Sequence, residues 1–152
     1  MAEAAATDDQ RGAQSYELAE VLYSLFSQLH RQIPREISPT AGATMARLND
    51  VGPQRITVLA EQQGVAQPSM TALVSGLEQS GSVVRRRDPA DGRAILVELT
   101  EQGRDEVAAR RRSRAAWFSG YISELSAVDR ERLTAAVPAL QSLDQLMRGA
   151  GS

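Results

Sequence analysis

Four arginines around a short turn carry the most distinctive chemistry of this 152-residue chain. Arg85, Arg86 and Arg87 precede a Pro-Ala-Asp-Gly turn, and Arg93 follows it. An arginine at a hairpin tip fits a narrow DNA minor groove, where negative potential is concentrated, and neighbouring arginines can neutralise backbone phosphates. We therefore expect Arg93 in a minor groove, oriented by Asp91, which could also cap the turn. Arg86 and Arg87 would bind phosphates. The alternative is a solvated surface hairpin whose arginines cluster by chance.

Small or uncharged side chains gather just upstream, on one face of a predicted helix. They are Gln67, Ser69, Thr71, Ala72, Ser75 and Gly76. Glutamine can pair with adenine through two hydrogen bonds, serine and threonine can bond to bases or phosphates, and methionine can touch a thymine methyl. We predict that the DNA-facing set is Gln67, Ser69, Met70, Thr71 and Ser75. An ordinary amphipathic helix with a polar solvent face is the alternative, and this helix alone does not decide between them.

Two short helices joined by a tight turn must position these side chains. The first has an apolar face of Ile56, Leu59 and Ala60, and Gly64 suits the left-handed position after its end. Pro68 fits the first turn of the second helix, where its missing N–H costs nothing. The apolar stripe of this second helix consists of Met70, Leu73, Val74 and Leu77.

The residues after Gly81 predict a two-stranded ribbon. Apolar and basic residues alternate from Val83 to Arg87, and Ile95, Val97 and Leu99 share one face of the returning strand. Period-two alternation around an Asp-Gly turn indicates a β-hairpin. The predicted fold class is therefore mainly α with a small β-hairpin wing.

Longer helices frame this central part. Residues 15–32 carry apolar side chains at spacings of three and four, which predicts a strongly amphipathic helix. Ser38 and Pro39 predict the start of a second helix that runs to Leu48. Thr100 is the expected cap of the helix after the ribbon, and Ser126 with Asp129 resembles a capping box for the last one.

Four motifs occur in a fixed order along the chain: GVAQPSMTALVSGLEQSG (64–81), RRRDPADGR (85–93), LTEQGR (99–104) and LSAVDR (125–130). With them, residues 15–147 closely resemble the multiple-antibiotic-resistance regulator (MarR) family. The resemblance implies a homodimeric winged helix-turn-helix transcriptional regulator, a repressor, that binds a palindromic operator in double-stranded DNA. It also implies that a small aromatic or phenolic ligand releases the DNA.

This resemblance divides the chain into three regions. Residues 1–14 are expected to be a flexible tail, residues 15–37 and 101–148 a helical dimerisation region, and residues 38–100 the winged helix-turn-helix. A ligand pocket would lie where the first, second and post-wing helices meet the DNA-reading part. Its candidate residues are Tyr23, Phe26, His30, Met45 and Trp117, although packing in a core or interface explains each of them better.

The chain departs from the family pattern in the recognition helix. Ala72 and Gly76 stand where many members carry basic residues, and Ala66 stands where a serine often caps the helix. Phosphate contacts supply much of protein–DNA affinity, so the wing and helix N-termini would have to provide them here. A winged-helix module that binds protein and has weak or no affinity for DNA is therefore the alternative function.

The composition also argues against several other classes of protein. The formal net charge is −2, yet residues 83–93 hold four arginines against two acids, so the positive charge is local. There is no cysteine, no glycine-rich phosphate loop, no nucleophile motif and no metal-ligand cluster, and the single histidine, His30, suits a surface or interface better than catalysis. We therefore expect no enzyme, no cofactor and no metal site. Without an apolar span or a secretory signal pattern, we expect a cytoplasmic protein with no membrane partner.

Overall fold

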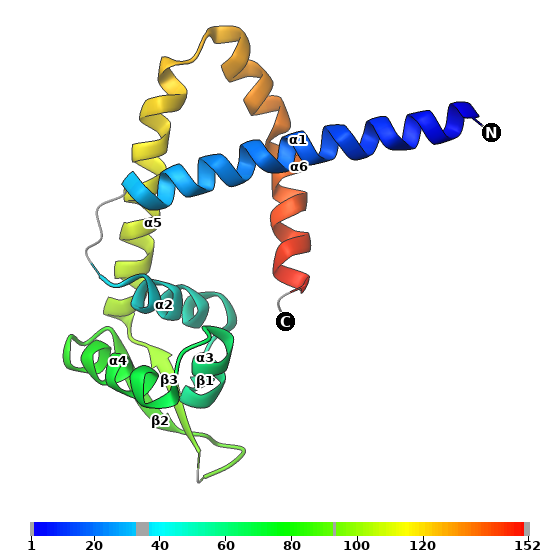
Figure 1. Cartoon of the computed structure of the whole chain (residues 1–152). Coiled ribbons are helices and arrows are strands. Elements are labelled where there is room, and N and C mark those ends of the chain that lie inside the picture. Colours follow the sequence, from blue (N-terminus) through cyan, green and yellow to red (C-terminus); the bar gives the residue numbers. More distant parts are fainter. Residues whose placement is uncertain (1, 33–36, 93, 151–152) are drawn as a thin grey trace. The chain divides into compact units, whose positions relative to one another are not determined.

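The structure is a computed structural model that describes residues 2–32, 37–92 and 94–150. For residues 2–11, 30, 32, 148 and 150 it describes the backbone alone. The chain divides into two compact units, residues 1–39 and residues 40–152. The first unit holds one long helix, α1 (Ala2–Gln32), and the second holds the remaining helices and strands, which Figure 1 labels.

Helix α1 begins thirteen residues earlier than the predicted start at Ser15. Alanine is the strongest helix former, and five of the first thirteen residues are alanine, which favours this extension. Fraying of residues 1–14 in solution stays a prediction. The apolar side chains of the helix, among them Leu18, Val21 and Phe26, are exposed within its own unit.

Three helices of the second unit form the helix-turn-helix and its support. They are α2 (Pro39–Val51), α3 (Ile56–Gln62) and α4 (Gln67–Gln79). Gly64 after α3 has a φ of 60° and Gly81 after α4 has a φ of 79°, so both occupy the left-handed region that favours glycine. The predicted turn between the two short helices and the predicted end of the second one are thus confirmed.

The sheet has three strands rather than the predicted two. Strands β2 (Val83–Arg87) and β3 (Ile95–Leu99) form the expected antiparallel hairpin, with Arg85 opposite Val97. A third strand, β1 (Gln54–Arg55), pairs with the other edge of β3, which gives the order β1-β3-β2. A strand of two residues is too short to show alternation in sequence, which is why the prediction missed it.

Two long helices follow the wing. Helix α5 (Glu101–Glu124) is capped as predicted, because the Thr100 hydroxyl accepts a hydrogen bond from the Gly103 N–H at 3.0 Å. Helix α6 (Ala127–Ala150) begins after Ser126, whose hydroxyl accepts from the Asp129 N–H at 3.1 Å. None of the described helices is long and apolar enough to cross a membrane.

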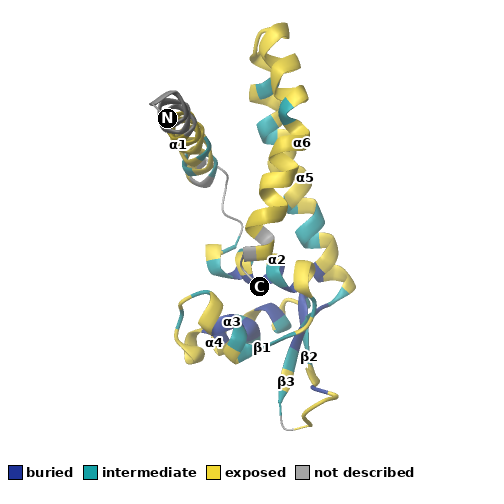
Figure 2. Ribbon diagram, turned by 90° about the vertical axis from the view of Figure 1, so that its right-hand side faces the viewer, coloured by how far each residue is buried: buried dark blue, intermediate teal, exposed yellow. Residues whose placement is uncertain are grey.

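The core lies in the middle of the chain, as the colours of Figure 2 show. The buried apolar side chains belong to α2, α3, α4 and the sheet: Ala41, Met45, Leu48, Leu59, Ala60, Met70, Val74, Leu77, Val83, Val97 and Leu99. We call residues 39–99 with this core the reading head. By contrast, Gly103 is the only buried residue in the described part of α5, and the described side chains of α6 include none.

Candidate nucleic-acid interface

Helix α4 presents a neutral polar face to solvent. Gln67, Ser69, Thr71, Ala72 and Gly76 are exposed, because Met70, Val74 and Leu77 take the opposite face into the core. At its start Ala66 provides no side-chain hydrogen bond, so the first N–H groups of the helix keep room for an external acceptor such as a phosphate. The exposed positions agree with the predicted DNA-facing set except at two residues.

Met70 is the first exception, and its placement in the DNA-facing set is wrong. Its side chain is completely buried, with its sulfur 3.9 Å from the Thr44 hydroxyl oxygen of α2. A residue held inside the core cannot reach a base edge. The helical spacing that places Met70 with Val74 and Leu77 in one apolar stripe outweighs its position in the first turns of the helix.

Gln63 occupies a place where an apolar residue is common in this motif. Its amide donates a 2.6 Å hydrogen bond to the buried hydroxyl of Thr44, which itself donates to the Thr40 carbonyl at 2.8 Å. The buried Thr44 hydroxyl therefore has hydrogen-bond partners at the edge of the core, where leaving it unpaired would cost about 1–3 kcal/mol of stability. The departure at Gln63 is therefore compensated by a partner on α2.

Ser75 is the second exception, because the wing already engages it. The Arg85 side chain reaches from β2 to α4, where Nη2 donates to Ser75 Oγ at 2.8 Å. The same guanidinium pairs with Glu78 through Nη1, at 2.9 Å. Ser75 is consequently half-buried, and its main described role is to fix Arg85 against the recognition helix. Its contact with DNA remains a prediction.

Two of the three consecutive wing arginines are exposed but differ in their partners. Arg86 Nε lies 2.9 Å from Glu98 Oε2, and the other oxygen of Glu98 lies 3.3 Å from Arg104 of α5. Within the described residues, no ion pair holds Arg87, the last residue of β2. Exposed ion pairs contribute at most about 1 kcal/mol, so Arg86 could exchange Glu98 for a phosphate at little cost.

The turn between the strands is organised by an arginine that the sequence did not reveal. Arg55 of β1 donates to Asp88 Oδ2 from Nε at 3.1 Å and from Nη2 at 2.6 Å, and Nη2 also lies 3.5 Å from Asp91 Oδ2. Asp91 therefore has Arg55 as a partner, which the sequence did not suggest. Arg93, the predicted minor-groove residue, lies outside the described residues, so its orientation by Asp91 stays a prediction.

Asp88 is the most strongly held carboxylate of the wing. The hydrogen bonds from Arg55 are the largest cause that lowers its pKa below the usual value, followed by the Ala90 N–H, which donates to Oδ1 at 2.9 Å. The same hydrogen bonds raise the pKa of Arg55. The pair is therefore charged over the whole range in which the protein would meet DNA.

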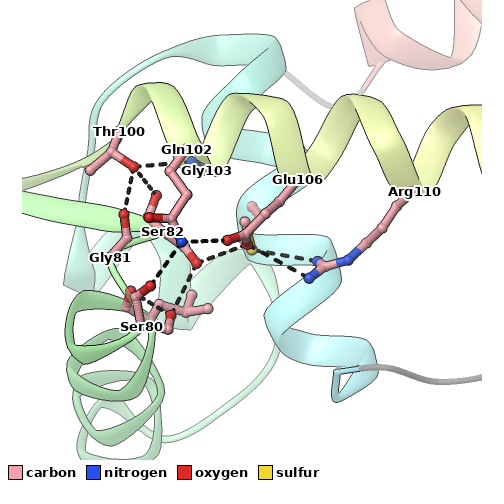
Figure 3. A network of polar contacts seen from close by, with 10 residues as sticks. Ser80, Gly81, Ser82, Thr100, Gln102, Gly103, Glu106 and Arg110 are labelled. Carbon is pink, nitrogen blue, oxygen red and sulfur yellow. Dashed lines mark hydrogen bonds and ion pairs between the residues drawn. The ribbon is translucent and has the colours of Figure 1, made fainter.

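The LTEQGR motif forms the joint between the wing and α5 (Figure 3). The Thr100 hydroxyl donates to the Gly81 carbonyl at 2.6 Å while it accepts from the Gly103 N–H. At Gly103 an added Cβ would lie 2.0 Å from the Ser82 carbonyl oxygen, so only glycine lets the first turn of α5 approach the residue before β2 this closely.

A chain of polar side chains extends this joint along α5 (Figure 3). Ser82 donates to Glu106 Oε2 at 2.8 Å, and the amide of Gln102 bridges Glu106 Oε1 at 2.9 Å and the Ser80 carbonyl at 3.0 Å. Arg110 lies 3.8 Å from Glu106, one helical turn further along. The end of the recognition helix and the start of the wing are thus tied to the same stretch of α5.

The unit of residues 40–152 holds two of the five candidate ligand residues, Met45 and Trp117. Met45 is fully buried in the reading head, and Trp117 lies against Tyr121 within α5, with the rings tilted by 58° and their centroids 4.7 Å apart. Tyr23 and Phe26 are exposed on α1, which belongs to the other unit. The side chain of His30 lies outside the described residues. The pocket therefore stays a prediction.

The described residues include no group of three or more histidine, cysteine, aspartate or glutamate side chains that could hold a metal ion. The chemistry of this surface is instead hydrogen bonding by short neutral side chains beside guanidinium groups. A helix with such a face, the turn before it and an arginine-bearing hairpin after it define a winged helix-turn-helix protein.

Comparison with known proteins identifies the family. Residues 37–95 match the sequence profile of the MarR family. An HTH-type transcriptional regulator of Mycobacterium bovis, Mb0904, is 30% identical over 132 residues, which cover 83% of this chain and 92% of that protein. The chain belongs to the MarR family of winged helix-turn-helix transcriptional regulators.

Solved structures share its fold. The transcriptional regulator Tm0710 of Thermotoga maritima superposes with a TM-score of 0.71 at 25% identity, covering 90% of this chain and 96% of that one. A single-residue mutant of Staphylococcus aureus MepR, solved bound to an oligodeoxyribonucleotide, superposes with a TM-score of 0.61 at 20% identity. The latter pair covers 85% of this chain and 96% of that one.

Proposed function

We propose that this protein is a homodimeric regulator that binds a palindromic DNA operator, represses its own or a neighbouring gene, and leaves the DNA when a small molecule binds. The observation that carries the proposal is the exposed neutral face of α4 beside an arginine-bearing wing. No catalytic step is required for this role. Access to the chromosome requires a cytoplasmic location.

Base recognition is assigned to the exposed start of α4. Gln67, Ser69 and Thr71 extend from the end of the helix that enters the major groove in other helix-turn-helix proteins. The Thr71 hydroxyl donates to the Gln67 carbonyl at 2.9 Å, which leaves its oxygen as an acceptor towards a base amino group. Without charged side chains here, selectivity comes from hydrogen bonds and close fit.

Affinity is assigned to the wing and to the start of α4. Arg87 is exposed, Arg86 is held by one exchangeable carboxylate, and the uncapped N-terminus of α4 favours a phosphate. Arg93 is proposed to enter the minor groove. The DNA-bound MepR mutant, which shares this fold, supports the proposal that DNA is the partner.

Dimerisation is assigned to the long helices. Helix α6 exposes Val128, Leu133, Val137, Leu140, Leu143, Leu146 and Met147, and α1 exposes a second apolar set that includes Leu18, Val21, Leu25 and Phe26. Exposed apolar rows of this length are costly in water and are typical of interaction surfaces. A second copy of the chain, as the family resemblance implies, would cover both.

Release is assigned to a small aromatic or phenolic molecule. Tyr23, Phe26, His30, Met45 and Trp117 remain the residues proposed to contact it. Stacking on Trp117, which already lies against Tyr121, would suit a planar ring.

A protein-binding role is the second candidate. It is favoured by the pairing of Arg85 with Glu78 and of Arg86 with Glu98, which reduces the positive charge available to phosphates. The net charge of −2 points the same way.

Binding to the DNA that flanks the coding region, measured at two salt concentrations with non-specific competitor, tests the proposal. Competitor-resistant binding to an inverted repeat with half-sites about one helical turn apart, together with a dimer mass in sedimentation, is the expected result. Weak binding that salt abolishes, with no preference for a repeat, would favour the protein-binding role.

Arg93→Ala tests the wing. We expect weaker binding to all sequences and a log–log salt slope that is smaller by about 0.9 for each phosphate the variant no longer neutralises. Arg132→Ala on α6 is the control, since Arg132 is an exposed arginine whose described ion partner is Asp129. An unchanged affinity and slope for Arg93→Ala would remove the wing from the interface.

A further inference from the structure

Arg55 joins three elements: β1, the start of α3 and the wing turn. It is the last residue of β1 and the residue immediately before α3, and its side chain binds the two aspartates of the wing. We propose that Arg55 is a positioning residue for DNA binding, which anchors the wing to the helix-turn-helix and neutralises its carboxylates without contacting DNA itself. The DNA part of this inference rests on the proposed function.

The backbone position of Arg55 indicates that its side chain has a role other than capping α3. The residue before a helix is usually serine, threonine, aspartate or asparagine, because a short oxygen-bearing side chain can accept from the first N–H groups. Arg55 stands at this position with extended dihedral angles, φ −70° and ψ 144°, and makes no capping hydrogen bond. A local rule broken in this way often marks a functional position.

The contacts of Arg55 point away from α3 and into the turn. Both Nε and Nη2 donate to one oxygen of Asp88, and the second oxygen of Asp88 accepts from the Ala90 N–H at 2.9 Å. The Asp88 side chain is 10% exposed, whereas the Arg55 side chain is 42% exposed. The guanidinium thus closes over a nearly buried carboxylate whose other side is held by the turn itself.

Backbone hydrogen bonds close the turn around this carboxylate. The Asp88 N–H donates to the Ala94 carbonyl at 3.0 Å, Asp91 N–H to the Asp88 carbonyl at 3.2 Å, and Ala94 N–H to the Asp91 carbonyl at 2.8 Å. Without Arg55, the carboxylates of Asp88 and Asp91 would repel each other inside this small loop. We expect the loop to open, so that Arg93 could no longer be directed at a minor groove.

Arg55 also reduces the negative charge that DNA would approach at the wing. Two carboxylates close to a phosphate backbone oppose binding, and one guanidinium shared between them removes part of that opposition. Because Arg55 belongs to β1 and leads into α3, the pairing also fixes the wing to the helix-turn-helix.

The test compares Arg55→Gln, Asp88→Asn and the double variant in the full-length protein, with Arg132→Gln as a charge-matched control on α6. In the free protein, hydrogen exchange at the Asp91 and Ala94 amides reports on the wing alone. We expect roughly tenfold faster exchange in Arg55→Gln, the size associated with losing a charge-assisted hydrogen bond, and no change in the control. Unchanged exchange would overturn the anchoring role.

Binding of the same variants to the operator separates positioning from direct contact. Positioning predicts roughly tenfold weaker binding for Arg55→Gln, a salt slope lowered no further than Arg93→Ala lowers it, and a double variant that binds no more weakly than Arg55→Gln. Additive effects in the double variant, with a slope that Arg55→Gln lowers by about 0.9 even when Arg93→Ala is already present, would identify a phosphate contact and overturn the proposal. Arg55→Lys, which keeps the charge but not the fork, should restore part of the affinity.

The two experiments also separate this inference from the proposed function. If the wild-type protein binds no operator but Arg55→Gln still loosens the turn, the DNA-binding function fails and the anchor stands as a structural feature only. If the wild type binds and Arg55→Gln binds equally well, the function stands and the positioning role is overturned.

Discussion

The recognition helix and the wing are held in place by different forces. Helix α4 is fixed by burial, since Met70, Val74 and Leu77 enter the core and its outer face makes few contacts. The base of the wing also enters the core, through Val83, Val97 and Leu99. The rest of the wing is held by charge, through pairs that link Arg55 to Asp88, Arg85 to Glu78 and Arg86 to Glu98. Burial is strong and insensitive to salt, whereas exposed ion pairs are weak and screened. The helix therefore supplies a rigid neutral surface, and the wing a charged arm whose partners can be exchanged.

Removing an apolar side chain from α4 should produce the largest effect of this comparison. We expect Met70→Ala to lower the free energy of unfolding by about 2–5 kcal/mol, because it leaves a cavity in the core. Urea unfolding at fixed protein concentration measures this. Ser69→Ala, one residue away on the exposed face, should change stability by less than about 0.5 kcal/mol. Equal effects at both positions would contradict the view that burial holds this helix.

Two glycines should respond in opposite directions to the same substitution. Gly103→Ala places a Cβ against the Ser82 carbonyl, and we expect the free energy of unfolding to fall by about 1–3 kcal/mol as the joint between the wing and α5 shifts. Gly76→Ala on α4 meets open space within a helix, and should stabilise by about 0.5–1 kcal/mol. Thermal unfolding of the two variants measures the difference. A stabilising Gly103→Ala would mean that the joint is looser than its contacts imply.

How much the sequence could predict depended on how far apart along the chain the interacting residues lie. Features encoded within a few residues were predicted correctly: the left-handed glycine at position 64, the Thr100 cap and the hairpin around the Asp-Gly turn. Met70 was misplaced because its position near the helix start suggested a DNA contact, although its spacing already placed it in the apolar stripe.

Contacts between distant residues could not be predicted in this way. Arg55 and Asp88 are 33 residues apart, and β1 is too short to leave a period in the sequence, so nothing local linked the two side chains. The pairing of Arg85 and Arg86 with Glu78 and Glu98 was missed for the same reason. Only the fold shows that arginines expected to face phosphates already have carboxylate partners.

Acid should weaken the wing before it affects α4. The Arg55 pairing lowers the pKa of Asp88 below its usual value of about 3.8, so the stabilisation is present above that pH and disappears as the pH falls through the lowered value. We expect Asp88→Asn to be less stable than the wild type near neutral pH, with the difference shrinking below about pH 3.8. Unfolding measured across this range, with Ser69→Ala as the reference, tests the sign. A difference that persists or grows in acid would be inconsistent with the pairing.

The smallest change in stability should accompany a gain in DNA binding. Glu98 lies between Arg86 and Arg104, so Glu98→Gln should release both guanidinium groups while costing at most about 1 kcal/mol of stability. If Arg86 exchanges Glu98 for a phosphate, the variant should bind operator DNA more tightly than the wild type. Its log–log salt slope should also be steeper, by about 0.9 for each additional phosphate neutralised.

Glu131→Gln on α6 removes the same charge from an exposed position outside the reading head, and so measures the effect of net charge alone. A gain in DNA affinity for Glu98→Gln that exceeds this control would mean that the wing arginines stay paired with carboxylates until a phosphate replaces them. Equal gains would mean that Arg86 keeps its internal partner on DNA, and phosphate binding would then rest on Arg87 and the N-terminus of α4.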